Sequence, residues 1–162
     1  MEERAWIMKI ASLKFSEEEK PSFYDVKVDD NRDVRYYNEE GRLHRLDGPA
    51  IEYASGTKAW YVNGKRHRLD GPAVVWGNNK VWYVNGKQHR LDGPAVEFSD
   101  GGKVWYVHGK RHRLDGPAIE YANGDKEWWV NGKRIGKSTR GFTDKKFEQW
   151  KKKHGYESRF KV

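Results

Sequence analysis

The sequence predicts a mainly β protein: an elongated antiparallel meander of stacked β-hairpin repeats of 22–23 residues, with a C-terminal capping helix. Two observations carry this prediction. The segment HRLDGPA occurs four times, starting at His44, His67, His89 and His112, and a fixed period of this length is typical of folds that stack one unit. In every repeat a β-forming run is followed by Asn-Gly or His-Gly, which strongly indicates a hairpin turn.

Composition adds a third observation. Leu, Ile, Val and Phe together supply only 30 of 162 residues. A chain in which these residues make up less than roughly 20% is expected to be disordered. The same chain carries 8 Trp and 9 Tyr, and disordered chains are poor in such rings. We therefore expect one ordered domain whose interior is built from aromatic side chains.

Each repeat contains a hairpin whose register follows from its turn. Asn63-Gly64 is expected to form a two-residue type I′ turn, which places Val62 opposite Lys65 and Tyr61 opposite Arg66. The second repeat is one residue shorter in its Gly-rich turn. Both strands of that repeat therefore keep their register.

Strict alternation of side chains predicts two faces. The first face is interpreted as the core. It holds one Trp and one Leu per repeat: Trp60, Trp82, Trp105 and Trp128 with Leu46, Leu69, Leu91 and Leu114. The second face is expected to meet solvent. It holds Tyr61, Tyr83, Tyr106 and Trp129 beside Arg66, Arg68, Arg90, Arg111, Arg113 and Arg134.

The ends of the chain differ from its centre. Residues 1–43 are expected to form an N-terminal cap and a degenerate first repeat, with a helix favoured over residues 1–20, while residues 44–134 form the four repeats. Residues 135–162 form a C-terminal segment with a capping helix that begins after Thr143, ends near His154 and is followed by Gly155. Phe147 and Trp150 are expected to lie over the last hairpin.

The formal charge of +8 is unevenly distributed: residues 1–43 carry −3, residues 44–134 carry +5 and residues 135–162 carry +6. The chain has no cysteine and no apolar run long enough to span a bilayer. We expect a cytoplasmic protein, located in the host cytoplasm if a phage encodes it. Its lysine-rich terminal helix has too short an apolar stripe for a membrane partner.

The repeated HRLDGPA segment, followed by W-Y-x-N-G-K, resembles MORN-type repeats and, more closely, their bacterial and phage variant class. The resemblance covers roughly residues 34–155. It implies a non-catalytic binding scaffold, and some variants of this class are similar to antitoxin-like or immunity-like partner proteins. Some MORN-type arrays are reported to bind anionic lipids. In this chain the turns continue as H-R-L-D-G-P instead of a Gly-rich H-G-x-G, so the resemblance does not lead us to expect lipid binding.

Most of the repeated polar residues have a structural interpretation. Each Arg of HRLDGPA lies two residues before an Asp, and four identical pairs indicate a repeated structural joint, not one specialised catalytic site. The four histidines are expected to lie roughly 9–10 Å apart, too far to share one metal ion. The sequence also shows no phosphate-binding loop and no nucleophile motif. We therefore expect no enzyme activity, no cofactor and no metal.

The face with Tyr and Arg is the candidate binding site, because these residue types are favoured at the few interface positions that supply most of the binding energy. The predicted set is Tyr61, Arg66, Arg68, Tyr83, Arg90, Tyr106, Arg111, Arg113 and Trp129. The alternative is a surface ladder in which rings and guanidinium groups stack on each other.

The sequence supports two hypotheses for function. The first is a phage-encoded inhibitor of a host defence or toxin component that acts by protein binding, which rests on the family resemblance. The second is sequestration of a small anionic nucleotide, or nucleic-acid binding, through the face with Tyr and Arg. No oligomeric state is predicted.

Overall fold

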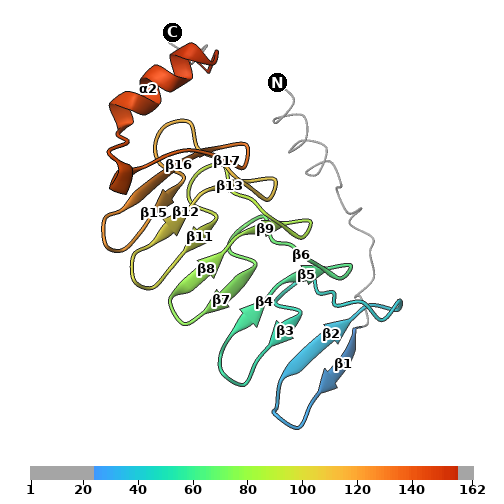
Figure 1. The fold of residues 1–162 in the computed structure, drawn as a ribbon. Coiled ribbons are helices and arrows are strands. Elements are labelled where there is room, and N and C mark those ends of the chain that lie inside the picture. The colour runs from blue at the N-terminus through green and yellow to red at the C-terminus, as the bar shows by residue number, and fades with distance from the viewer. Residues whose placement is uncertain (1–23, 157–162) are drawn as a thin grey trace.

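The computed structural model describes residues 24–156, and within them the fold is one long antiparallel sheet with a helix at its C-terminal end (Figure 1). The helix expected over residues 1–20 lies outside the described residues. The sheet has eleven strands. Their order is β1 (Asp25–Val28), β2 (Val34–Tyr37), β3 (Ile51–Glu52), β4 (Lys58–Ala59), β7 (Val74–Trp76), β8 (Asn79–Val81), β11 (Val96–Glu97), β12 (Lys103–Val104), β15 (Ile119–Glu120), β16 (Lys126–Val130) and β17 (Lys133–Lys137).

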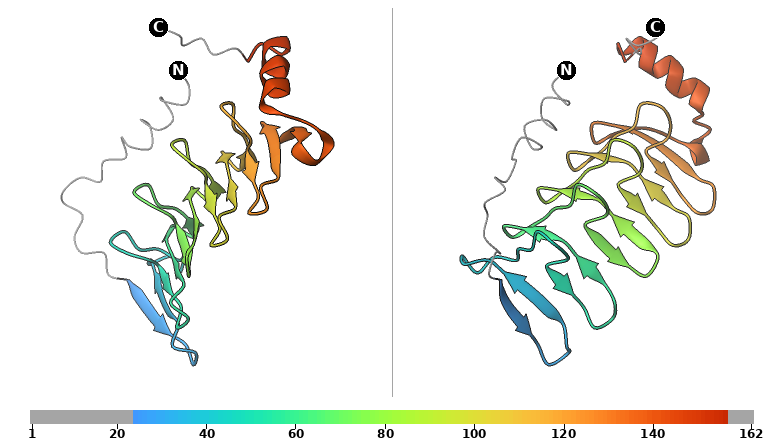
Figure 2. Two further views of the ribbon diagram at one scale, coloured as in Figure 1. Left: turned by 90° about the vertical axis from the view of Figure 1, so that its left-hand side faces the viewer. Right: turned by 180° about the vertical axis from the view of Figure 1, so that it is seen from behind.

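A second row of hairpins projects from one side of this sheet (Figure 2). Its members are β5 (Tyr61–Val62) with β6 (Lys65–Arg66), β9 (Tyr83–Val84) with β10 (Lys87–Gln88), and β13 (Tyr106–Val107) with β14 (Lys110–Arg111). The outer ends of β16 and β17 supply the fourth hairpin. We call residues 61–67, 83–89, 106–112 and 129–135 the hairpin row.

Each repeat passes from the sheet to the hairpin row at its tryptophan. The Trp60 N–H donates to the Ala73 carbonyl of the next sheet strand (2.8 Å), while the Trp60 carbonyl accepts from the His67 N–H in the hairpin (3.1 Å). Trp82 and Trp105 make the equivalent bonds. The tryptophan backbone therefore joins the two layers. This junction is not predicted by the alternation of side chains along a single flat meander.

The predicted turns and registers are confirmed. Asn63 and Gly64 have φ values of 48° and 76°, as a type I′ turn requires, and Tyr61 pairs with Arg66 as Val62 pairs with Lys65. In the short second repeat Trp76 pairs with Asn79. The missing residue therefore falls in the turn, and the strands stay in register.

The predicted leucine core is wrong. Leu46, Leu69 and Leu91 are 44%, 63% and 49% exposed. The chain bends at Leu69–Gly71 instead of continuing as a strand, so the alternation that would bury the leucines ends before it reaches them. Most buried apolar side chains of the repeats lie in the long sheet or next to it: Ala50, Ile51, Ala59, Ala73, Val81, Ala95, Val96, Ala118, Ile119, Trp128 and Val130. Val84, in the hairpin row, is also buried.

The arginine of HRLDGPA takes the place expected for leucine. The guanidinium carbon of Arg90 lies 4.1 Å from the centre of the Trp82 ring, and a Cβ at Gly93 would lie 3.0 Å from the same atom. Arg90 Nε donates to Asp92 (2.9 Å), which confirms the predicted pairing. The arrangement recurs at Arg45, Arg68 and Arg113. A side chain in place of the glycine after each Asp would push against the guanidinium, which fills that space.

The histidine of HRLDGPA joins neighbouring hairpins. His67 Nδ1 accepts from the Asn85 N–H (3.2 Å), and the Gly86 N–H donates to the Arg66 carbonyl (2.8 Å). His44, His89 and His112 accept in the same way from Asn63, His108 and Asn131. Each turn is therefore fixed to the preceding repeat by two backbone donors.

We predict that acid weakens this joint. Burial lowers the pKa of His67 from its usual 6.5, and the Asn85 side chain beside the same nitrogen only partly opposes this shift. Below pH 6.5 the unfolded chain takes up a proton more readily than the folded chain. The free energy of unfolding is therefore expected to fall as the pH decreases from 7 towards 5. His67→Gln should show a smaller decrease in urea titrations over this range, and an unchanged pH dependence would contradict the prediction.

The predicted capping helix is α2 (Asp144–Lys153), and Thr143 caps it by accepting from the Lys146 N–H. Phe147 is 1% exposed and packs with Trp128 and Val130, while Trp150 covers the same cluster. In this last repeat Phe142 lies against Trp128, with ring centres 5.2 Å apart. Phe142 and the helix thus cover the ring that an arginine covers in earlier repeats.

Candidate binding groove

The two faces of the long sheet carry different side chains. Because cross-strand partners point to the same side, Val74, Val81, Val96 and Val104 form one row on the face that meets the hairpin row. The adjacent row on the opposite face alternates in charge over most of its length. It contains Glu52, Lys58, Val75, Lys80, Glu97, Lys103, Glu120 and Lys126.

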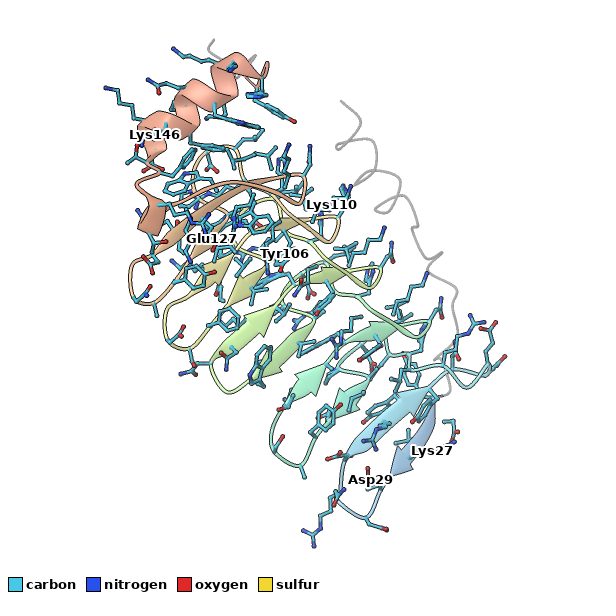
Figure 3. All side chains as sticks on the ribbon, in the orientation of Figure 1. Lys27, Asp29, Tyr106, Lys110, Glu127 and Lys146 are labelled. Atoms are coloured by element: carbon cyan, nitrogen blue, oxygen red, sulfur yellow. The ribbon has the colours of Figure 1, made fainter. Side chains whose placement is uncertain are left out.

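A groove of about 510 Å³ lies between the valine row and the hairpin row. Tyr83 and Tyr106 line it from the hairpins, with Tyr106 labelled in Figure 3. Trp76 and Phe98 line it from the sheet and are 36% and 42% exposed. Tyr53 and Tyr121 occupy the equivalent positions in the first and fourth repeats and are also exposed. The groove therefore has an apolar floor between two rows of rings.

Arginines of the hairpin row hold these rings in place. Arg66 Nε donates to the Tyr61 hydroxyl (3.0 Å), and its guanidinium carbon lies 5.3 Å from the centre of the Tyr83 ring in the next repeat. Arg111 donates to the Tyr106 hydroxyl (3.2 Å) and lies 4.8 Å from the Trp129 ring centre. Rings and cations are thus fixed before any partner arrives, which lowers the entropy lost on binding.

Three arginines of the hairpin row form no ion pair with any carboxylate that the structure describes. Within residues 24–156 no carboxylate lies within 4.0 Å of Arg66, Arg111 or Arg134. Burial opposes the charged form of Arg66, but its hydrogen bonds to Tyr61 and Tyr83 outweigh burial and raise its pKa. Guanidinium groups of this kind attract anions.

The arginines of the opposite face are already neutralised. Arg90 and Arg113 each pair with an Asp and a Glu, at 2.8–2.9 Å, and the Arg90 partner Asp92 has a pKa below its usual value because of that hydrogen bond. Both arginines line a separate hollow of about 520 Å³ with Trp105. That hollow therefore offers little net charge to a ligand.

The nine predicted site residues do not share one face. Tyr61, Arg66, Tyr83, Tyr106, Arg111 and Trp129 lie together along the hairpin row. Arg68, Arg90 and Arg113 pack instead on the tryptophans of the other face. The expectation of a single face fails because the chain leaves the extended conformation after the hairpin, so residues 66 and 68 need not point to the same side.

Besides the four valines of the groove floor, sequence reasoning missed three lining residues: Trp76, Phe98 and Gln88. The aromatic residue that lies three positions after HRLDGPA was visible in every repeat. Only the sheet register shows that it faces the same side as Tyr83 and Tyr106. Gln88 occupies the position that Arg66 and Arg111 hold in their repeats, so the groove lacks one cation at its centre.

A buried carboxylate lies in the last repeat, beside the Trp129 ring that Arg111 covers. Glu127, labelled in Figure 3, is 5% exposed and accepts from Trp129 Nε1 at 2.9 Å and from the Tyr121 hydroxyl at 3.3 Å. Burial and then this carboxylate raise the pKa of Tyr121. Lys137 Nζ lies 3.7 Å from Glu127. The carboxylate is therefore engaged by its own repeat and does not cancel the charge of Arg66.

Over the described residues, no helix is both long and apolar enough to cross a membrane. The same part of the chain contains no group of three histidine or acidic side chains placed to hold a metal ion. Compared with protein-family models and with curated proteins, the chain matches neither a family nor an individual protein.

Proposed function

We propose that this protein is a non-enzymatic binding scaffold that acts by binding an anionic partner along the groove. One observation carries the proposal: Arg66 and Arg111, which line the apolar groove beside its rings, have no carboxylate partner among the described residues. The arginines supply attraction and orientation, and the rings supply buried area.

The roles of the repeated polar residues support a scaffold. A catalytic histidine needs a free nitrogen near the reacting atom, whereas Nδ1 of each repeat histidine accepts from the next turn. Each Asp of HRLDGPA is paired with its own arginine. In every repeat, one ring nitrogen of the histidine and the carboxylate of the Asp are thus used in structural contacts.

Two classes of partner fit this description. A protein with an acidic surface would be held by the Tyr, Trp and Arg side chains that dominate protein interfaces. In that form the scaffold would act as a phage-encoded inhibitor of a host defence or toxin component, as the family resemblance implies. A nucleotide or nucleic acid is favoured by the uncompensated arginines beside exposed rings.

Affinity capture with two variants tests the proposal. Tyr83→Ala/Arg111→Ala removes one ring and one cation from the groove, and we expect it to lose most of the material that the wild-type chain retains from a cell lysate. The matched control Leu69→Ala/Lys80→Ala removes one exposed apolar side chain and one cation from outside the groove. It should retain that material.

Bound proteins are identified by mass spectrometry, and bound nucleic acid or nucleotide by extraction. Equal loss in both variants, or no loss in either, would contradict the assignment of the groove as the binding site. Thermal melts of the two variants check that each remains folded.

A further inference from the structure

The hairpin row holds basic residues and no acidic ones. Residues 61–67, 83–89, 106–112 and 129–135 contain seven basic residues and no Asp or Glu. The rest of the segment 44–134 contains eight basic and ten acidic residues. The folded chain therefore concentrates the positive charge of its repeats in one layer, and the sheet layer is slightly negative. The seven cations are Lys65, Arg66, Lys87, Lys110, Arg111, Lys133 and Arg134.

The lysines of this layer are aligned along the array. A Cβ placed on Gly86 would lie 3.8 Å from the Cβ of Lys65, and Gly109 and Gly132 stand in the same relation to Lys87 and Lys110 at 3.6 and 3.7 Å. One exposed lysine thus follows another at each repeat. With two strands per repeat, the step is about 9–10 Å. This is a regular row of like charges, which suits a linear polyanion.

The rings lie alongside this row. Tyr83 and Tyr106 come from the same hairpins as Lys87 and Lys110, and they line the groove with Trp76 and Phe98. An aromatic ring beside a cationic track is the arrangement on which unpaired bases stack. A duplex keeps its bases stacked internally, so it offers no unpaired base to these rings.

We propose, building on the proposed function, that the partner is a single-stranded nucleic acid, with its phosphates along the hairpin row and its bases against the groove rings. Binding is tolerant of sequence. The Tyr61 and Tyr106 hydroxyls are already engaged by arginine, and Gln88 is the one amide side chain among the residues that line the groove. With Arg66 and Arg111 assigned to phosphate, few groups of the described groove remain to read base edges by hydrogen bonds.

An acidic protein fits the hairpin row less well. Protein interfaces pair charges of both signs across a rim, whereas the hairpin row has no acidic residue to meet a basic group of a partner. A regular step of about 9–10 Å also matches a repeating backbone charge better than the irregular carboxylates of a folded surface.

Fluorescence anisotropy with a labelled oligothymidylate of roughly 12 nucleotides tests this assignment. We expect binding by the full chain to weaken steeply with salt, with a log–log slope of about −5 if all seven cations meet phosphate. A duplex of the same length should bind at least about fivefold more weakly, because it gains no stacking.

Two variants separate the contributions. Lys87→Gln/Lys110→Gln should weaken binding and reduce the slope by about 1.4, since each lost phosphate contact removes about 0.7. Tyr83→Ala/Tyr106→Ala should weaken binding at least about tenfold and leave the slope unchanged, because the rings carry no charge. The charge-matched control Lys80→Gln/Lys103→Gln, from the opposite face of the sheet, should change affinity less than about twofold.

Equal effects of the two lysine pairs would overturn the proposal, because attraction would then depend on net charge alone. Duplex binding as tight as single-strand binding would also overturn it. If the oligonucleotide fails to bind while lysate capture still depends on Tyr83 and Arg111, the partner class is wrong and the proposed function stands. If the tyrosine variant is unfolded in a thermal melt, the lysine pairs, whose side chains are exposed, still decide the question.

Discussion

Trp128→Ala is expected to lower the free energy of unfolding of the C-terminal repeat by about 3–5 kcal/mol. The indole is 2% exposed, packs with Phe142 and Phe147, and donates from Nε1 to Asp144 at 3.1 Å. Truncation therefore leaves a cavity below the helix and removes a hydrogen bond between sheet and helix. Hydrogen exchange at the amides of β16 and β17 measures the loss.

The matched control for this change is Trp82→Ala. Trp82 is half-buried and covered by the Arg90 guanidinium instead of apolar side chains. Solvent can refill part of the space, so the expected loss is about 1–3 kcal/mol. Equal losses at the two positions would show that the helix does not complete the core and would contradict this account of the cap.

Arg90→Ala is expected to cost about 2–3 kcal/mol. The side chain donates to Asp92, to the Pro94 carbonyl and to Glu97, and it covers Trp82. Glu97 is only 32% exposed. Removing the guanidinium leaves this carboxylate partly desolvated without its partner, and that penalty exceeds the strength of an exposed ion pair. Urea titration followed by tryptophan fluorescence measures the change.

The second repeat offers an internal comparison. Val75 stands where three other repeats have Glu52, Glu97 or Glu120, so Arg68→Ala leaves only Asp70, which is 81% exposed and can be hydrated. We expect a loss of about 1–2 kcal/mol. In a Val75→Glu background the cost of Arg68→Ala should rise, as a double-mutant cycle would measure. A coupling energy near zero would contradict the role assigned to the glutamate.

Part of the candidate site could be predicted from the sequence. Tyr61 with Arg66, and Tyr106 with Arg111, were placed on one face by the turn alone, because a two-residue turn fixes the pairs on either side of it. Arg68, Arg90 and Arg113 were assigned to the same face by extending the alternation through a segment that is not a strand. Trp76 and Phe98 were visible in the sequence, but the pairing of separate repeats places them in the groove.

By itself the sequence determined the repeat unit, its hairpin register and the capping helix. These depend on residues close together in the chain: Asn63-Gly64 for the turn and Thr143 for the helix start. Only the tertiary structure decided which arginines keep their charge for a partner. Arg90 meets Glu97 seven residues away, and Arg66 meets Tyr83 in the next repeat. Compensation of charge depends on such distances in space, and local pattern does not encode them.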